Sequence, residues 1–97
     1  MLKRAAHSGG ILKDELAELD VTPTELARQI DVPANRVSQI INDKRSISGD
    51  TALRLGHWFQ INPQFWMNLQ ARFELVAVQE EAGKVIRKLP TRPAEEL

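Results

Sequence analysis

The sequence predicts an all-α protein, a bundle of five helices, and three observations support this. Apolar residues recur at steps of three and four from about residue 9 to about residue 81, as they do on amphipathic helices. No segment rich in Val, Ile and Thr alternates with a period of two, the pattern of a half-buried strand. Pro23 and Pro63 each follow a residue that can cap a helix. The 97 residues suffice for one hydrophobic core.

The first two helices are predicted from an apolar stripe and from a cap. Residues 9–19 form the first helix, whose stripe is Leu12, Leu16 and Leu19. Residues 22–30 form the second helix. Thr22 can cap it, Pro23 suits its first position, and Glu25 lies three residues after the cap, which is the spacing of a capping box.

Three more helices follow. Residues 34–42 form the third, because Pro33 is acceptable in a first turn. Its buried residues are predicted to be Val37, Ile40 and Ile41. Ser48 can cap the fourth helix, whose stripe is Ala52, Leu55 and Phe59. Asn62 and Pro63 begin the fifth, whose stripe is Trp66, Leu69, Phe73 and Val76.

The chain divides into three regions. The stripe of the fifth helix fades at Gln79, and residues 82–94 hold four basic residues and no acidic one. We therefore expect an N-terminal arm over residues 1–8, a helix-turn-helix domain over residues 9–78, and a partly flexible C-terminal extension over residues 79–97.

The composition excludes several classes of protein. The absence of cysteine excludes disulfides, zinc–thiolate sites and thiol nucleophiles. The two histidines, His7 and His57, lack the spacing of metal ligands, and no serine lies in a nucleophile elbow, so we expect no metal, no cofactor and no enzyme activity. No apolar run approaches the roughly 20 residues of a membrane span, and the N-terminus does not resemble a signal peptide, so we expect a cytoplasmic protein.

The second and third helices together have the lengths and the three-residue connection of a helix-turn-helix, over about residues 22–42. Ala27 supplies the small side chain needed where one helix lies close under the other. Val37 and Ile40 supply apolar side chains where the later helix sits on the core. Asp31 occupies the turn, where it tolerates a left-handed backbone better than most residues do.

The outer face of the third helix favours DNA binding. It carries Asn35, Arg36, Ser38 and Gln39, which are residue types suited to base edges and phosphates. A merely solvated face would be rich in Glu and Lys, as in the alternative of a five-helix bundle that binds nothing.

The formal net charge of zero is unusual for such a protein, but the charges are segregated. Residues 9–31 have a net charge of −4, residues 34–48 one of +2, and residues 82–94 one of +4. The chain therefore lacks the broad basic surface that binds DNA strongly without regard to sequence, but it retains a modest basic patch around the third helix.

Several segments resemble the HigA antitoxins, which belong to the Cro/CI (XRE) type of helix-turn-helix proteins. They are residues 7–12, 26–27, 32–40, 42–45, 50–55 and 62–70. The most discriminating is Phe65-Trp66-Met67-Asn68-Leu69-Gln70, which generic Cro/CI-type domains lack. The resemblance covers roughly residues 7–77. The chain departs from it at Ser8 and Gly10, where proline and glutamate are usual, and at Asp43, where glycine is common.

The resemblance implies a fold, a function and partners. The fold is the Cro/CI repressor-like bundle, and the active species is a homodimer bound to a palindromic operator at its own promoter. The protein partner is a toxin of the HigB type, a small RNA-cleaving enzyme related to RelE, which the antitoxin neutralises. No membrane and no small-molecule ligand are expected.

The resemblance also implies which residues contact DNA, because the start of the third helix enters the major groove in Cro/CI-type proteins. Base contacts are implied for Ala34, Asn35, Arg36, Ser38 and Gln39. Phosphate contacts are implied for Thr22, Asn42, Lys44 and Arg45. Simpler roles remain open: Asn35 can be a helix cap, and the three basic residues can be ordinary surface charges.

Dimerisation is a physical need, because one short recognition helix reads only a half-site, and a two-fold dimer places two such helices about 34 Å apart. The small core has little room for the apolar residues late in the chain. We predict the interface at Phe73, Val76, Val78, Val85, Ile86 and Leu89. Two other functions stay open, a stand-alone repressor without a toxin and a protein-interaction module.

Overall fold

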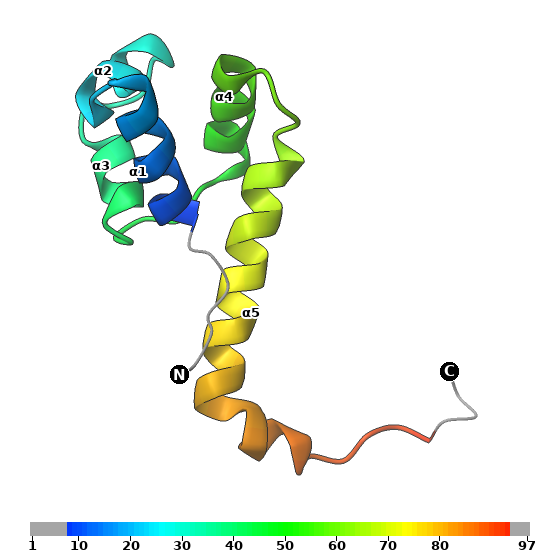
Figure 1. Ribbon diagram of the computed structural model, residues 1–97. Helices are drawn as coiled ribbons and strands as arrows, with labels where there is room; N and C mark the ends of the chain where they lie inside the picture. The colour runs from blue at the N-terminus through cyan, green and yellow to red at the C-terminus, as the bar shows by residue number, and fades with distance from the viewer. Residues whose placement is uncertain (1–7, 94–97) are drawn as a thin grey trace.

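The computed structural model describes residues 8–93, and this part of the chain folds into five α-helices without a β-strand (Figure 1). The helices are α1 (Ser8–Leu19), α2 (Pro23–Gln29), α3 (Arg36–Ile41), α4 (Gly49–Phe59) and α5 (Gln64–Arg87). The all-α, five-helix prediction is therefore confirmed. In the described range no helix is both long enough and apolar enough to cross a membrane.

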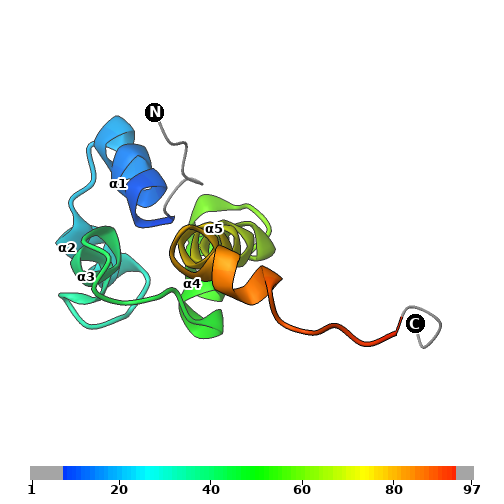
Figure 2. The ribbon, with the colours of Figure 1, turned by 90° about the horizontal axis from the view of Figure 1, so that it is seen from below.

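The helices pack as two groups joined by α1. Helices α1 and α2 both pack against α3, and α4 packs against α5. Helix α1 also contacts α5, so it connects the two groups, and Figure 2 shows α1, α2 and α3 side by side to one side of α5. The core between them consists of Leu12, Leu16, Leu26, Ala27, Ile30, Val37, Ile40, Ile47, Ala52, Leu55 and Trp66.

One apolar residue of the predicted stripe on α1 is not in the core. Leu19 is 51% exposed, so this part of the prediction is wrong. The chain turns at Asp20, which has a φ of 57°, and the N–H of Val21 then donates to the carbonyl of Leu16 over 3.0 Å. Val21 thereby packs against the core in place of Leu19.

Helices α1 to α4 all end in a Schellman motif, and none of the four uses glycine. The residues with a left-handed backbone are Asp20, Asp31, Asp43 and Gln60, whose φ values lie between 57° and 60°. In each motif the following residue donates its N–H to the carbonyl five positions back, over 2.8–3.0 Å. The expected left-handed turn at Asp31 is thus confirmed.

The last helix is longer than its apolar stripe suggested. Helix α5 continues past Gln79 to Arg87, because helix-forming residues persist and the next proline is Pro90. Its first backbone donors are capped by Asn62, whose Oδ1 accepts from the N–H of Gln64 over 2.9 Å. The distal half of α5 runs on beyond the other helices (Figure 1).

Candidate DNA-binding site

The site begins at the N-terminus of α2. Thr22 is the N-cap, as predicted, and its Oγ1 accepts a hydrogen bond from the N–H of Glu25 over 3.1 Å. This bond does not use the hydroxyl hydrogen, so the exposed Thr22 side chain can still donate to a phosphate. Pro23 occupies the first helical position, which needs no donor.

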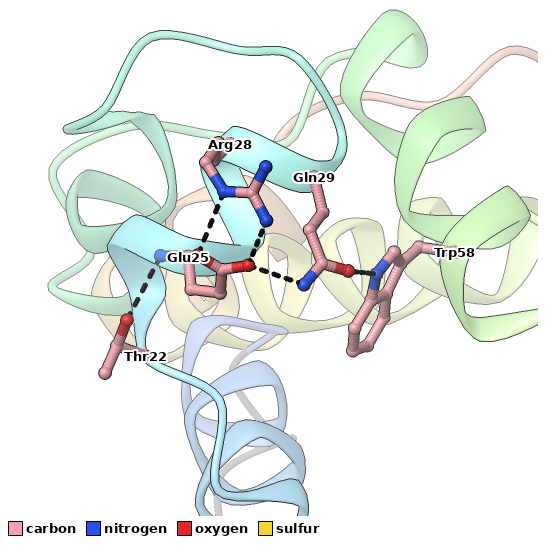
Figure 3. Close-up of polar contacts among 5 residues, drawn as sticks. All are labelled: Thr22, Glu25, Arg28, Gln29 and Trp58. Atoms are coloured by element: carbon pink, nitrogen blue, oxygen red, sulfur yellow. Dashed lines mark hydrogen bonds and ion pairs between the residues drawn. The ribbon is translucent and has the colours of Figure 1, made fainter.

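The reciprocal half of the predicted capping box does not form, because the Glu25 carboxylate is turned along the helix (Figure 3). Its Oε1 accepts from Nε of Arg28 over 3.0 Å, and its Oε2 accepts from Nε2 of Gln29 over 2.8 Å. The hydrogen bonds from Arg28 and then Gln29 lower the pKa of Glu25 to about 2. Glu25 therefore orders the exposed side of α2 rather than its first turn.

The same chain of contacts reaches α4. Gln29 accepts a 2.7 Å hydrogen bond on Oε1 from Nε1 of Trp58, so the amide joins the carboxylate on α2 to the indole on α4 (Figure 3). The Trp58 ring is half-buried and packs edge-on against Phe59, with ring centroids 4.8 Å apart. This contact links the helix-turn-helix to the second group of helices.

Arg54 on α4 fixes the turn between α2 and α3. Its Nη1 donates to the carbonyls of Ile30 and Asp31, over 2.8 and 3.2 Å, and its Nε donates to Asp50 over 2.9 Å. The carbonyls at the end of α2 are thus satisfied by a cation, as the helix dipole favours. Sequence reasoning missed this role of Arg54, because the two partners lie 23 and 24 positions away in the chain.

The start of α3 carries the predicted base-reading residues, although the helix begins at Arg36 rather than at residue 34. Ala34 and Asn35 precede it and are exposed, whereas the side chains of Ser38 and Gln39 are half-buried, as is Arg36. Asn35 is the N-cap residue, yet its side chain forms no capping hydrogen bond. It is therefore available for another partner.

Asn35 and Gln39 lie on the same face of α3, as predicted, because the N–H of Gln39 donates to the carbonyl of Asn35 over 3.0 Å. The hydroxyl of Ser38 donates to that same carbonyl, also over 3.0 Å, so its hydrogen is used locally. Ser38 can offer only an acceptor to a base, which narrows its predicted role.

The end of α3 brings the predicted phosphate-binding residues together on an exposed turn. Asn42, Lys44 and Arg45 are all exposed, and the turn is closed by Asp43 with a φ of 58°. Arg45 folds back along the helix, and its Nε donates to Oε1 of Gln39 over 2.9 Å. One predicted phosphate contact is thus hydrogen-bonded to one predicted base contact.

Gln70 on α5 holds the loop that follows this turn. Its Nε2 donates to the carbonyl of Ile47 over 3.1 Å, and its Oε1 accepts from the N–H of the same residue. Ile47 is buried in the core, so the loop is attached both by an apolar side chain and by two backbone hydrogen bonds. The sequence marked Gln70 only as part of a motif shared with a family, not by any local signal.

The structure divides the predicted dimer residues between two sides of α5. Phe73 and Val76 are half-buried, whereas Val78, Val85, Ile86 and Leu89 are between 49% and 67% exposed. A further exposed residue, Leu75, was missed by the sequence prediction.

The structure also bears on the two histidines. His57 is exposed, which corrects our expectation of a partly buried residue, and His7 lies outside the described residues. Between residues 8 and 93, no group of three His, Cys, Asp or Glu side chains is placed to hold a metal ion.

Comparison with known proteins supports the same interpretation of this geometry. The helix-turn-helix family HTH_3 matches residues 12–66, more than half of the chain. An addiction module antidote protein of the HigA family from Coxiella burnetii is 41% identical, with a TM-score of 0.89, and the match covers 94% of this chain and 100% of that one.

The chain belongs to the HigA antitoxins of the helix-turn-helix family. The HigA antitoxin of Pseudomonas aeruginosa, solved with the higBA promoter, is 42% identical with a TM-score of 0.84, over 94% of this chain and 99% of that one. Virulence-associated protein A' of Dichelobacter nodosus is 37% identical over 91% of this HigA protein and 77% of its own length. Membership in this family of regulators also makes the protein a non-enzyme, as predicted.

Proposed function

We propose that this HigA protein is a homodimeric antitoxin that binds a palindromic operator at its own promoter and neutralises a small RNA-cleaving toxin of the HigB type. The observation that carries the DNA-binding part is the exposed start of α3, where Asn35 projects without a capping bond one turn before Gln39. The HigA antitoxin of Pseudomonas aeruginosa was solved with its promoter, which supports this choice of ligand.

The proposed DNA contacts sort into two kinds. Ala34, Asn35, Arg36, Ser38 and Gln39 would meet base edges in the major groove, while Thr22, Asn42, Lys44 and Arg45 would meet phosphates on either side. Along the chain the proposed phosphate contacts lie before and after the proposed base contacts, at the two ends of the short helix pair, so they would fix the orientation of α3 in the groove. A modest positive charge suits a protein whose affinity depends on base contacts and on a dimer.

DNA binding is tested by fluorescence anisotropy on the duplex upstream of the protein's own gene, with a scrambled duplex of equal length as control. We expect tighter binding to the upstream duplex, and a loss of about 1–3 kcal/mol on that duplex for Asn35→Ala. Equal affinity of the wild-type protein for both duplexes would contradict operator binding.

The proposed dimer interface is a seam on the distal half of α5 and on the turn directly after it, which holds Leu89. Leu75, Val78, Ala82, Val85 and Leu89 follow one another at steps of three, four, three and four, which is the spacing of a heptad repeat. Four of the five are between 49% and 69% exposed. None of the five belongs to the core or is among the apolar residues that pack against it, so this seam has no core partner within residues 8–93.

Toxin binding rests on family membership. It is tested by coexpressing the protein with the adjacent open reading frame, followed by a growth assay and by copurification. We expect growth inhibition by the neighbouring gene alone, relief on coexpression, and a stable complex. A neighbour without toxicity and without binding would favour the stand-alone repressor, a protein with the same helix-turn-helix and no toxin.

A further inference from the structure

The hydrogen bond between Arg45 and Gln39 changes what α3 presents to DNA. An amide side chain has one acceptor atom, its oxygen with two lone pairs, and one donor group, its NH₂ with two hydrogens. Nε of Arg45 donates to that oxygen over 2.9 Å, so the acceptor end of Gln39 is engaged and lies beside a positive charge. The NH₂ end of Gln39 carries no such partner and stays available.

The backbone after α3 makes this contact possible. Asp43 adopts a left-handed conformation, and the N–H of Lys44 donates to the carbonyl of Gln39 over 2.8 Å. The chain therefore doubles back at the helix end, which returns Arg45 to the level of Gln39 although six positions separate them. Lys44, the neighbouring cation, makes no such contact with the amide in the described structure.

The chemistry of base edges gives this pair a preference. In the major groove guanine presents two acceptors, N7 and O6, whereas adenine presents one acceptor and one amino donor. A free glutamine matches adenine through its oxygen and its NH₂ together. When Nε of Arg45 donates to the Gln39 oxygen, one of the two lone pairs of that oxygen is occupied and the amide is held in one orientation. The groups that this pair can offer to a base are then mostly donors, namely the NH₂ of Gln39 and the remaining N–H groups of Arg45.

We propose that Arg45 is a positioning residue that orients Gln39 as a donor, so that the two side chains read guanine in preference to adenine. This inference rests on the proposed operator binding and deepens it. It reassigns Arg45 from a phosphate contact to a determinant of specificity, and it replaces adenine with guanine as the base expected opposite Gln39.

The test measures binding to operator duplexes in which each base pair of one half-site is replaced in turn, at one fixed salt concentration. We compare the wild type with Gln39→Ala, Arg45→Ala and Arg45→Lys. Lys44→Ala is the matched control, because it removes the adjacent positive charge and leaves the contact with Gln39 intact. Far-UV circular dichroism verifies that these substitutions leave the helices folded.

We expect one base pair at which the wild type prefers G·C to A·T by about tenfold, within the range of one good base contact. Gln39→Ala and Arg45→Ala should each abolish that preference at the same base pair, and their combination should remove no more. Arg45→Lys should restore affinity but not the preference, since a lysine lacks the planar guanidinium. Lys44→Ala should weaken binding to all the duplexes by the same factor.

Two results would overturn the inference while leaving operator binding in place. One is a Gln39-dependent base pair at which the wild type prefers A·T. The other is an Arg45→Ala protein that loses affinity uniformly and keeps every base preference, as a phosphate contact would. A wild-type protein without any sequence preference would overturn both the inference and the operator proposal.

Discussion

Glu25 shows how a single side chain can serve a purpose different from the one its position indicates. Its spacing from Thr22 is that of a capping box, but its carboxylate binds Arg28 and Gln29 instead. An arginine three residues on competes well for the carboxylate, because a charged, two-pronged partner binds more strongly than a backbone N–H does. The carboxylate therefore joins a network that ends at Trp58.

This arrangement predicts how the stability of the protein depends on pH in the acid range. The folded-state pKa of Glu25 is about 2, below the ordinary value of 4.5, so its stabilising effect is complete above pH 4.5 and is lost as the pH falls toward 2. We expect the urea midpoints of the wild type and of Glu25→Gln to differ by a constant amount from pH 7 to pH 5 and to converge below pH 4.5. A gap that stayed constant down to pH 2.5 would contradict the assignment.

A second prediction concerns Lys44, which is exposed at the end of α3. If it contacts a phosphate, Lys44→Ala should weaken binding to every duplex and flatten the slope of log affinity against log salt by about one unit. Lys13→Ala, on the acidic α1, is the control and should leave the slope unchanged. A loss confined to one operator sequence would assign Lys44 to base reading instead.

At this scale the sequence predicted positions better than it predicted partners. It placed Thr22 at a cap, Asp31 at a left-handed turn, and Asn35 and Gln39 on one face, because each depends on neighbours within four residues. It could not predict that Arg45 would reach Gln39. That contact depends on the left-handed turn in between and on one choice among many rotamers.

Among the elements, the junction between α4 and α5 is tight because it is built around Gly56. A Cβ on Gly56 would lie 2.8 Å from the carbonyl oxygen of Ile61 and 3.0 Å from the nitrogen of Pro63. Both are backbone atoms, which cannot move aside as the end of a side chain can. The loop between α4 and α5 therefore lies closely against α4 only because this residue has no side chain.

We predict that Gly56→Ala lowers the free energy of unfolding by about 1–3 kcal/mol, as overpacking of a core does. Chemical denaturation measures it. Gly49→Ala is the control, since a Cβ there meets nothing within 4 Å, and its effect should be neutral or slightly stabilising. Equal effects of the two substitutions would argue against the close packing described.

The loop between α3 and α4 depends on Gln70 in a similar way. Gln70→Ala would leave the N–H and the carbonyl of Ile47 without their partner, at a cost of about 1–3 kcal/mol for partly buried groups. Gln64→Ala removes only an exposed bond to Asn68 on the same helix, so it should change stability by less than about 0.5 kcal/mol. If Gln70→Ala lowered the free energy of unfolding no more than Gln64→Ala does, the loop would not depend on its hydrogen bonds to α5.

The extent of the elements was predictable where the core determines them and less so elsewhere. Caps and prolines located the starts of α2, α4 and α5 to within a residue or two. The end of α5 was missed, because the predicted stripe followed contacts with the core, and the core ends near Leu69. The helix continues for 18 more residues, none of which is a core residue, and their helix-forming composition favours that continuation.

At the scale of the whole molecule, the long α5 protrudes beyond the other helices (Figure 1). The part of α5 beyond Leu69 extends roughly 27 Å at 1.5 Å per residue, and four of the five residues of its apolar seam are exposed. An isolated helix with exposed leucine and valine gains little stability by itself, and a second copy of the chain is the occupant that our proposal of a two-fold operator calls for.

This leads to a prediction about assembly. Val78→Glu combined with Val85→Glu should convert the protein from a dimer to a monomer of 11.0 kDa, because two buried carboxylates would face each other across the seam. Light scattering after size-exclusion chromatography measures it. Lys84→Glu adds an acid to the opposite side of the same helix and should leave the dimer intact. A dimer that survives both valine substitutions would place the interface elsewhere.

The fold as a whole was predicted correctly, since five periodic segments admit few arrangements. The division of the late apolar residues between two sides of α5 was not predicted. Phe73 and Val76 were grouped with the seam because all are apolar and late in the sequence. At about 100° per residue they lie on the other side of the helix from Val78 and Val85.

The hydrogen bond from Trp58 to Gln29 places a fluorescent indole at the contact between α2 and α4. The chain contains no tyrosine and two tryptophans, so its near-ultraviolet fluorescence comes from Trp58 and Trp66. Trp66 is buried, and its Nε1 has no hydrogen-bond partner among residues 8–93, which suits emission at short wavelength from an apolar site. Trp58 sits where the helix-turn-helix meets α4. A Trp66→Phe protein would therefore report, through one indole and without any added dye, whether that junction stays closed when DNA or toxin arrives.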